Sequence, residues 1–141
     1  MNAKQYLKQY KRILERLRQM KKEIQFIEAQ IESTGGINDG MPRGTDVSDK
    51  TGRIAAMLAD QKGQYEWTLV ESIKKKQEIE NTINQVEDPI LARLLYDRYI
   101  ENMSWKETAK DLPASESYTR GDLHKKALAA VTELIVQLST Q

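Results

Sequence analysis

The sequence predicts an all-α protein in which a long antiparallel helical hairpin, a coiled coil, precedes a three-helix domain. Apolar residues recur at helical spacing along most of the chain, and only three prolines interrupt it. Four of the seven glycines gather between residues 34 and 48 together with one proline, which indicates a loop. We therefore expect residues 1–87 to form the hairpin around this loop and residues 88–141 to form the second domain.

The composition narrows the class of protein. The chain has 141 residues, of which 30% are charged, and it contains no cysteine, so disulfides, thiolate zinc sites and thiol catalysis are excluded. No apolar run approaches the ~20 residues that a membrane-spanning helix needs. The first residues lack the apolar core of a signal peptide. We expect a cytoplasmic protein with no membrane segment.

The first predicted helix carries a heptad repeat of apolar residues. Leu7, Leu14 and Phe26 widen the apolar stripe beyond the two seam positions. Because no Gly or Pro occurs before residue 35, we expect one uninterrupted helix whose seam pairs with the second helix or with a second copy, giving a homodimer through the N-terminal helices. The seam residues are Tyr6, Tyr10, Ile13, Leu17, Met20, Ile24, Ile27 and Ile31.

The same helix is basic, with a net charge of +4 over residues 1–33 from eight Lys or Arg and four Glu. Such residues are most often the solvated face of a coiled coil, which is the interpretation we favour here. Two alternatives are contact with DNA phosphates and docking on an acidic surface of RNA polymerase. The basic residues are Lys4, Lys8, Lys11, Arg12, Arg16, Arg18, Lys21 and Lys22.

The second helix is predicted to run from about Asp49 to Val86 and to fold back against the first. Ser48 is a suitable N-cap because its hydroxyl can accept a hydrogen bond from a free amide of the first turn. The residues expected on its apolar side are Ile54, Leu58, Tyr65, Leu69, Ile73, Ile79, Ile83 and Val86.

A third helix is predicted from Pro89 to about Glu101, because Asp88 provides an N-cap and proline suits the first helical position. Ser104 and Glu107 form a capping-box pattern that opens the fourth helix. The residues expected to be buried in these two helices are Leu91, Leu94, Leu95, Tyr99, Ile100, Ala109 and Leu112, and Trp105 is interpreted as a core residue.

A turn at Leu112–Ser115 leads into a longer last helix, with Ser115 as its N-cap. Two helices joined by a tight turn, the second the longer, are typical of a helix-turn-helix unit that places its second helix in a DNA major groove. The apolar stripe expected on the last helix consists of Leu123, Ala127, Leu128, Val131, Leu134, Ile135 and Leu138.

The stretch from Asp88 to Leu128 resembles region four of bacterial sigma factors, a promoter-reading helix-turn-helix. The matching segments are Leu95–Ile100, Ser104–Ala109, Ser115–Glu116 and Leu123–Leu128. The whole chain is similar to the ArpU/RinA-type late-gene activators of Gram-positive phages and prophages, in which a phrase like Gly40–Thr45 followed by Val47–Asp49 recurs. This resemblance implies that the protein is a phage-encoded transcription regulator, which binds double-stranded DNA and acts together with host RNA polymerase.

The sequence departs from the sigma pattern in the turn and in the last helix. Pro113 stands where the turn usually carries Gly, and because proline does not adopt a positive φ, the turn needs a different backbone. Thr108 replaces an apolar residue, Gly121 lies inside the last helix, and Asp122 stands where a basic residue is common. Residues 88–141 have a net charge of −1, which is unusual for a DNA-binding unit.

The start of the last helix supplies the candidate DNA-binding residues, of which Arg120 is the strongest because arginine contacts guanine or phosphate. Lys125 and Lys126 suit phosphate contacts, although a solvated face explains them nearly as well. Tyr118 either stacks on a sugar or packs against the turn, and a packing role is the simpler explanation of His124. The full set is Ser115, Ser117, Tyr118, Arg120, Gly121, His124, Lys125 and Lys126.

Enzymes and metal proteins are not expected, because the sequence contains no phosphate-binding loop, nucleophile–base pair or metal-ligand spacing. We expect no cofactor. The role of the Met41–Gly44 segment is left open. Two alternatives to a regulator are a small terminase-like DNA-packaging protein and a polymerase-binding interaction module that does not contact DNA.

Overall fold

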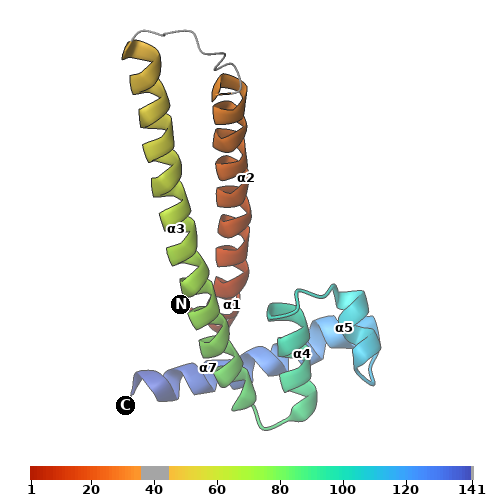
Figure 1. Cartoon of the computed structure of the whole chain (residues 1–141). Coiled ribbons are helices and arrows are strands. Elements are labelled where there is room, and N and C mark those ends of the chain that lie inside the picture. Colours follow the sequence, from red (N-terminus) through yellow and green to blue (C-terminus); the bar gives the residue numbers. More distant parts are fainter. Residues whose placement is uncertain (36–44, 141) are drawn as a thin grey trace. The chain divides into compact units, whose positions relative to one another are not determined.

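The computed structural model describes residues 1–35 and 45–140, and every regular element within them is a helix (Figure 1). The middle of the predicted loop, residues 36–44 with Met41–Gly44, therefore falls outside the described residues. None of the described helices is both long and apolar enough to cross a membrane. The elements are α1 (Ala3–Leu7), α2 (Gln9–Gly35), α3 (Thr45–Asn84), α4 (Pro89–Tyr99), α5 (Trp105–Asp111), α6 (Glu116–Tyr118), η1 (Thr119–Leu123) and α7 (His124–Ser139).

The chain divides into two compact units. One comprises residues 1–13 and 72–141, and the other comprises residues 14–71. The C-terminal helices thus share a unit with both ends of the N-terminal region, whereas the sequence suggests a boundary after residue 87. One contact that joins these ends is a hydrogen bond of 2.9 Å between Tyr6 Oη and Thr82 Oγ1.

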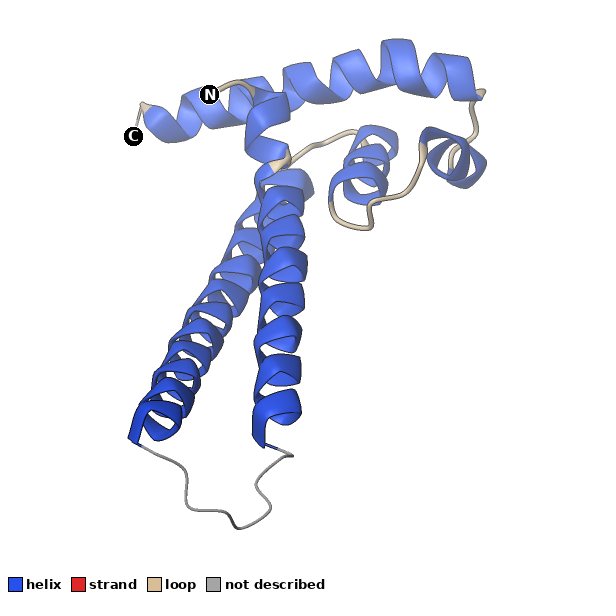
Figure 2. Cartoon of the chain, turned by 90° about the horizontal axis from the view of Figure 1, so that it is seen from above, coloured by secondary structure: helices blue, strands red, loops and turns tan. Residues whose placement is uncertain are grey.

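In the unit of residues 14–71, α2 and α3 lie side by side and run in opposite directions (Figures 1 and 2). Lys62 Nζ on α3 lies 3.7 Å from Glu28 Oε1 on α2. The predicted seam of α2 is covered within one chain, since Leu17, Met20 and Ile24 are each at most 8% exposed. A homodimer through this seam would therefore have to displace α3.

Two expectations about the apolar faces of these helices were wrong. Leu69 and Ile73 of α3 are 41% and 53% exposed, and Phe26 of α2 is 66% exposed. Thr68 and Ser72 are buried instead, because the inner face of α3 keeps alternating steps of four and three residues and these polar side chains fall on it. Thr68 is satisfied there, since its hydroxyl donates to the Gln64 carbonyl at 2.8 Å.

Two helix boundaries also differ from the prediction. The first helix is interrupted at Lys8, whose amide donates to carbonyls of the preceding turn, so α1 and α2 are separate elements. Asn2, which the sequence analysis overlooked, caps α1 by a reciprocal pair of hydrogen bonds with Gln5. Helix α3 begins at Thr45, so Ser48 lies inside the helix and is not its N-cap.

The core of the other unit is formed where α4 and α1 pack against α7 (Figure 1). The residues expected to be buried in the third and fourth helices are all at most 9% exposed, as predicted. On α7 the prediction fails only at its end, where Leu138 is 54% exposed. The fully buried apolar side chains at the centre are Leu7 of α1, Ile79 and Ile83 of α3, Leu94 and Leu95 of α4 and Val131 of α7.

Candidate nucleic-acid interface

Helix α5 begins as its sequence predicts, with Ser104 as N-cap. The Ser104 hydroxyl oxygen accepts a hydrogen bond from the Glu107 amide at 3.1 Å. The capping box is only half formed, because the hydroxyl itself donates to the Glu107 carboxylate at 3.2 Å. Thr108 is fully buried and donates to the Ser104 carbonyl at 2.9 Å, so this hydroxyl in an otherwise apolar position has a partner.

The turn between α5 and α6 forms without a positive φ, as the presence of Pro113 requires. Leu112 is extended, with φ −117° and ψ 153°, and Ser115 is extended with φ −71° and ψ 158°. The Ala114 amide closes the turn by donating to the Leu112 carbonyl at 2.8 Å. Among the described non-glycine residues, only Asn102, in the preceding turn, has a positive φ, of 56°.

The helix that follows the turn is fixed at its start by Ser115. Its hydroxyl oxygen accepts from the Tyr118 amide at 3.2 Å, and its carbonyl accepts from the buried Thr119 hydroxyl at 2.7 Å. The backbone then widens into a π-helical turn at Thr119–Leu123 before continuing as α7. Helical periodicity does not predict this turn. Gly121, inside the helix, is the one local signal of it, and π-helical turns often occur at functional sites.

The outer surface of this helix start carries most of the residues singled out from the sequence. Ser115, Ser117, Arg120, Gly121, Lys125 and Lys126 are all exposed, and Tyr118 is 44% exposed. A shallow hollow of about 540 Å³ lies over Glu116, Ser117, Arg120 and Gly121. Because Thr119 and Leu123 are buried on the opposite side, the helix is anchored while this face stays open.

His124 is turned away from that face. Its Nε2 lies 2.7 Å from Tyr99 Oη, and its ring makes an edge contact with Trp105 at a centroid distance of 4.7 Å. Burial, with the positive charges of Lys4, Arg98 and Lys8, lowers the pKa of His124 to about 4. The imidazole is therefore neutral near pH 7 and packs between two aromatic rings, so we remove it from the candidate DNA contacts.

Arg98 of α4 contacts the turn before α5 and the first residue of α5. Its guanidinium lies 4.2 Å from the centre of the Trp105 ring, and Nη1 donates to the Met103 carbonyl at 2.6 Å. Trp105 in turn packs against the core, as predicted, and against His124 at the start of α7. A cation–π contact of this kind contributes about 0.5–2 kcal/mol, depending on how far the cation is desolvated.

An acidic pair and one arginine join α4 to α5. Arg93 Nε lies 2.6 Å from Asp111 Oδ2 and 3.4 Å from Asp97 Oδ1. Asp97 is 1% exposed, and burial together with the neighbouring Asp111 raises its pKa to about 6. The hydrogen bonds from Asp97 and Arg93 lower the pKa of Asp111 below its ordinary value.

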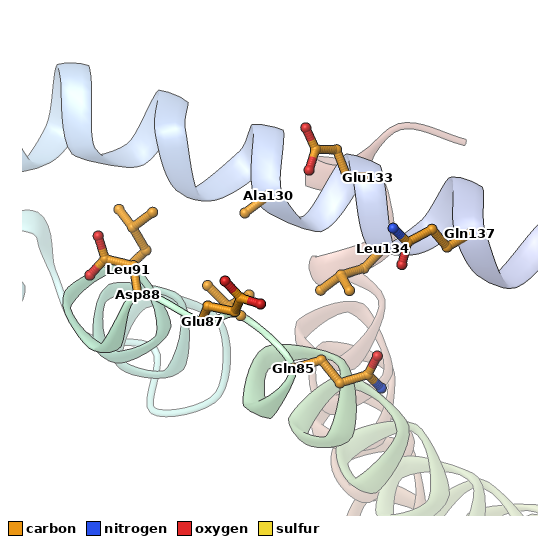
Figure 3. Close-up of a pocket in the computed structure, with 9 residues that line it drawn as sticks. Gln85, Glu87, Asp88, Leu91, Ala130, Glu133, Leu134 and Gln137 are labelled. Atoms are coloured by element: carbon orange, nitrogen blue, oxygen red, sulfur yellow. The ribbon is translucent and has the colours of Figure 1, made fainter.

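A second concave surface of this unit is acidic. Figure 3 shows it between the start of α4 and α7, where Leu91, Ala130 and Leu134 point into a cleft of about 320 Å³. The carboxylates that line it belong to Glu87, Asp88 and Glu133, and the other lining residues include no Lys or Arg. This cleft repels phosphate, so it is unsuited to DNA.

Residues 40–132 match a protein family described as proteins of unknown function, DUF1492. The match covers well over half of the chain. The chain belongs to the DUF1492 family. No curated protein and no solved structure matches it. The region shared with DUF1492 proteins includes α4, α5 and the helix start after Ser115, so the candidate interface lies inside the family-defining part. Within the described residues, no group of His, Cys, Asp or Glu is arranged to hold a metal ion.

Replacing Gly121 with alanine is expected to stabilise this DUF1492 protein by about 0.5–1 kcal/mol, because alanine is the better helix former. A Cβ atom at Gly121 would meet nothing within 4 Å, so no clash opposes the gain. Urea denaturation measures the change, with Gly63→Ala on α3, which is equally unobstructed, as the matched variant. A loss of stability specific to Gly121→Ala would show that the π-helical turn requires glycine.

Proposed function

We propose that the protein is a phage-encoded transcription regulator rather than an enzyme, and that it binds double-stranded DNA through the helix after Ser115. The observation that carries the proposal is the outward exposure of Ser117, Arg120 and Gly121 on a helix whose other side is anchored by Thr119. In this proposal α4, α5 and the continuous run from α6 to α7 are the three helices of a sigma-region-four-like helix-turn-helix domain. The resemblance to ArpU/RinA-type activators supports the same assignment.

The order of the contacts fits groove binding. Residues at the start of a recognition helix reach base edges, and residues further along it contact the backbone. Ser117 and Arg120 would then read bases, with Arg120 able to bind guanine through two hydrogen bonds. Lys125 and Lys126, which are exposed one turn later, would contact phosphates. Asp122 is exposed among them and opposes phosphate binding, so the affinity of this helix alone is expected to be low.

The test is a selection from a randomised duplex pool followed by binding measurements on the enriched DNA. Arg120→Ala is expected to weaken binding to the enriched duplex by about 1–3 kcal/mol, or roughly 5–150-fold, and to relax its sequence preference. Lys76→Ala removes the same charge from α3 and serves as the control. If no sequence is enriched, or if Arg120→Ala binds the enriched duplex as tightly as the parent, the DNA-binding proposal is wrong.

The acidic cleft favours one second candidate, an interaction module that contacts RNA polymerase and not DNA. Its three carboxylates and apolar floor suit a basic segment of a protein partner. The selection is therefore repeated with purified polymerase. Enrichment that requires polymerase and is insensitive to Arg120→Ala supports the interaction module, whereas enrichment by the protein alone supports the regulator.

A further inference from the structure

The basic residues of α2 are exposed and unpaired, which sets them apart from three of the lysines of α3. In the part of the chain that the structure describes, none of the α2 cations forms an ion pair, and these residues are Lys11, Arg12, Arg16, Arg18, Lys21 and Lys22. On α3, Lys62, Lys75 and Lys76 lie 3.7, 3.2 and 3.9 Å from glutamate oxygens. The positive charges of α2 are therefore not neutralised within the described part of the protein, whereas those of three α3 lysines are.

Two pairs of like charges on α2 stand at an unfavourable helical spacing. Arg12 and Arg16 are four residues apart, as are Arg18 and Lys22. Like charges at this spacing destabilise a helix by about 0.2–0.5 kcal/mol per pair. A face that only needs to be solvated is served as well by opposite charges three or four residues apart, such as Lys75 with Glu78 and Lys76 with Glu80 on α3. An anionic partner that lies against the helix attracts both cations of each pair and offsets their mutual repulsion.

Three of the six α2 cations lie on the face opposite the buried seam. Lys11, Arg18 and Lys22 are separated by seven and four residues, which places them on one side of the helix, along about 16 Å of its length. Glu15 lies on the same side, and these four side chains between Lys11 and Lys22 are all exposed and polar, whereas Phe26, one turn beyond Lys22, is 66% exposed. Protein interfaces have an apolar core, which the stretch from Lys11 to Lys22 lacks on this face. A nucleic-acid duplex instead offers one negative charge per about 1.7 Å.

We propose that the outward face of α2, defined by Lys11, Arg18 and Lys22, binds the phosphate backbone of double-stranded nucleic acid without reading its sequence. This surface is separate from the helix after Ser115, and it would supply the electrostatic affinity that the acidic residues 88–141 lack. The proposal thus goes beyond the proposed function and can hold or fail independently of it.

The test compares two triple variants that remove the same charge. The first carries Lys11→Gln, Arg18→Gln and Lys22→Gln, and the control carries Lys62→Gln, Lys75→Gln and Lys76→Gln. Fluorescence anisotropy measures binding of each full-length protein to a labelled duplex of arbitrary sequence over a series of KCl concentrations. For the α2 variant, the slope of log K against log salt is expected to become shallower by about 0.9 per lost contact, or about 2.7 in all. The control should keep the parental slope.

Each result distinguishes this surface from the recognition helix. Equal slopes for the two triple variants, or a parental slope for the α2 variant, would overturn the proposal and leave an acidic protein as the partner of α2. If Arg120→Ala binds the enriched duplex as tightly as the parent while the α2 variant shows a shallower salt slope, the proposed function fails. The proposal for the α2 surface then still holds. Circular dichroism confirms that both triple variants remain helical.

Discussion

Leu94→Ala is expected to reduce the free energy of unfolding by about 2–5 kcal/mol, enough to unfold a marginally stable domain. Leu94 is 0% exposed and belongs to the cluster that α4 forms with Val131 and Ala127 of α7. Truncation leaves a cavity that the neighbouring helices fill only in part. The higher helix propensity of alanine does not offset this loss, because it is worth a few tenths of a kcal/mol.

Ile90→Ala provides the matched control on the same helix, because Ile90 is 38% exposed. Its expected loss is below about 1 kcal/mol, since little apolar surface returns to water. Urea denaturation of both variants, followed by helical signal, gives the comparison. Equal losses at the two positions would mean that α4 is not the centre of the core, and the anchoring assigned to Thr119 and Leu123 would need a different origin.

A buried carboxyl group and a half-buried imidazole should give the stability of the protein opposing pH dependences. The folded pKa of Asp97 is about 6 and its ordinary value is 3.8, so between these values the folded state holds a proton that the unfolded chain has released. The contribution of Asp97 to stability therefore falls as the pH rises through this range. The folded pKa of His124 is about 4 and its ordinary value is 6.5, so here the unfolded chain binds the extra proton and stability rises with pH.

In the parent, the opposite slopes of stability against pH from Asp97 and His124 are expected to offset each other. Substituting either residue is expected to reveal the slope of the other. Asp97→Asn mimics the protonated carboxyl and removes the falling contribution, so its stability should rise with pH between about 4 and 6 more steeply than that of the parent. His124→Gln removes the rising contribution, so its stability should fall across the same range. Each slope changes by at most about 1.4 kcal/mol per pH unit, the value for one proton.

Urea midpoints measured at several pH values between 4 and 7 check both variants. The lowered pKa of Asp111 acts only below its ordinary value of 3.8 and leaves this window unaffected. Parallel profiles for Asp97→Asn and the parent would mean that Asp97 is ionised in the folded protein throughout. A His124→Gln profile as steep as that of the parent would mean that the imidazole protonates without leaving its place between Tyr99 and Trp105.

The local sequence signals were sufficient for most helices of the C-terminal unit. Asp88 caps α4 by accepting from the Ile90 amide at 2.9 Å, and Ser104 and Ser115 cap their helices as predicted. These hydrogen bonds join residues two or three positions apart, so the sequence contains both partners. The turn at Pro113 was predictable for the same reason, because proline restricts its own backbone.

The candidate site was predictable in its position and less so in its details. The sequence singled out Arg120 and Gly121 from their place after the turn, and both are exposed. It did not indicate that His124 faces Tyr99, which lies 25 positions away, or that Asp97 is buried beside Asp111. These arrangements depend on how α4, α5 and α7 pack, and periodicity within one helix carries no information about them.

The sequence by itself determined that the chain is helical, where most of its helices begin, and which face of α2 and α4 is buried, because hydrogen-bonded caps and helical periodicity are local properties. Only the tertiary structure decided the inner face of α3, where Thr68 and Ser72 replace Leu69 and Ile73. It also decided the π-helical turn at Thr119–Leu123 and the division of the chain at residues 13 and 72. The physical reason is that α3 carries apolar residues on more than one face, and the packing partner selects among these faces.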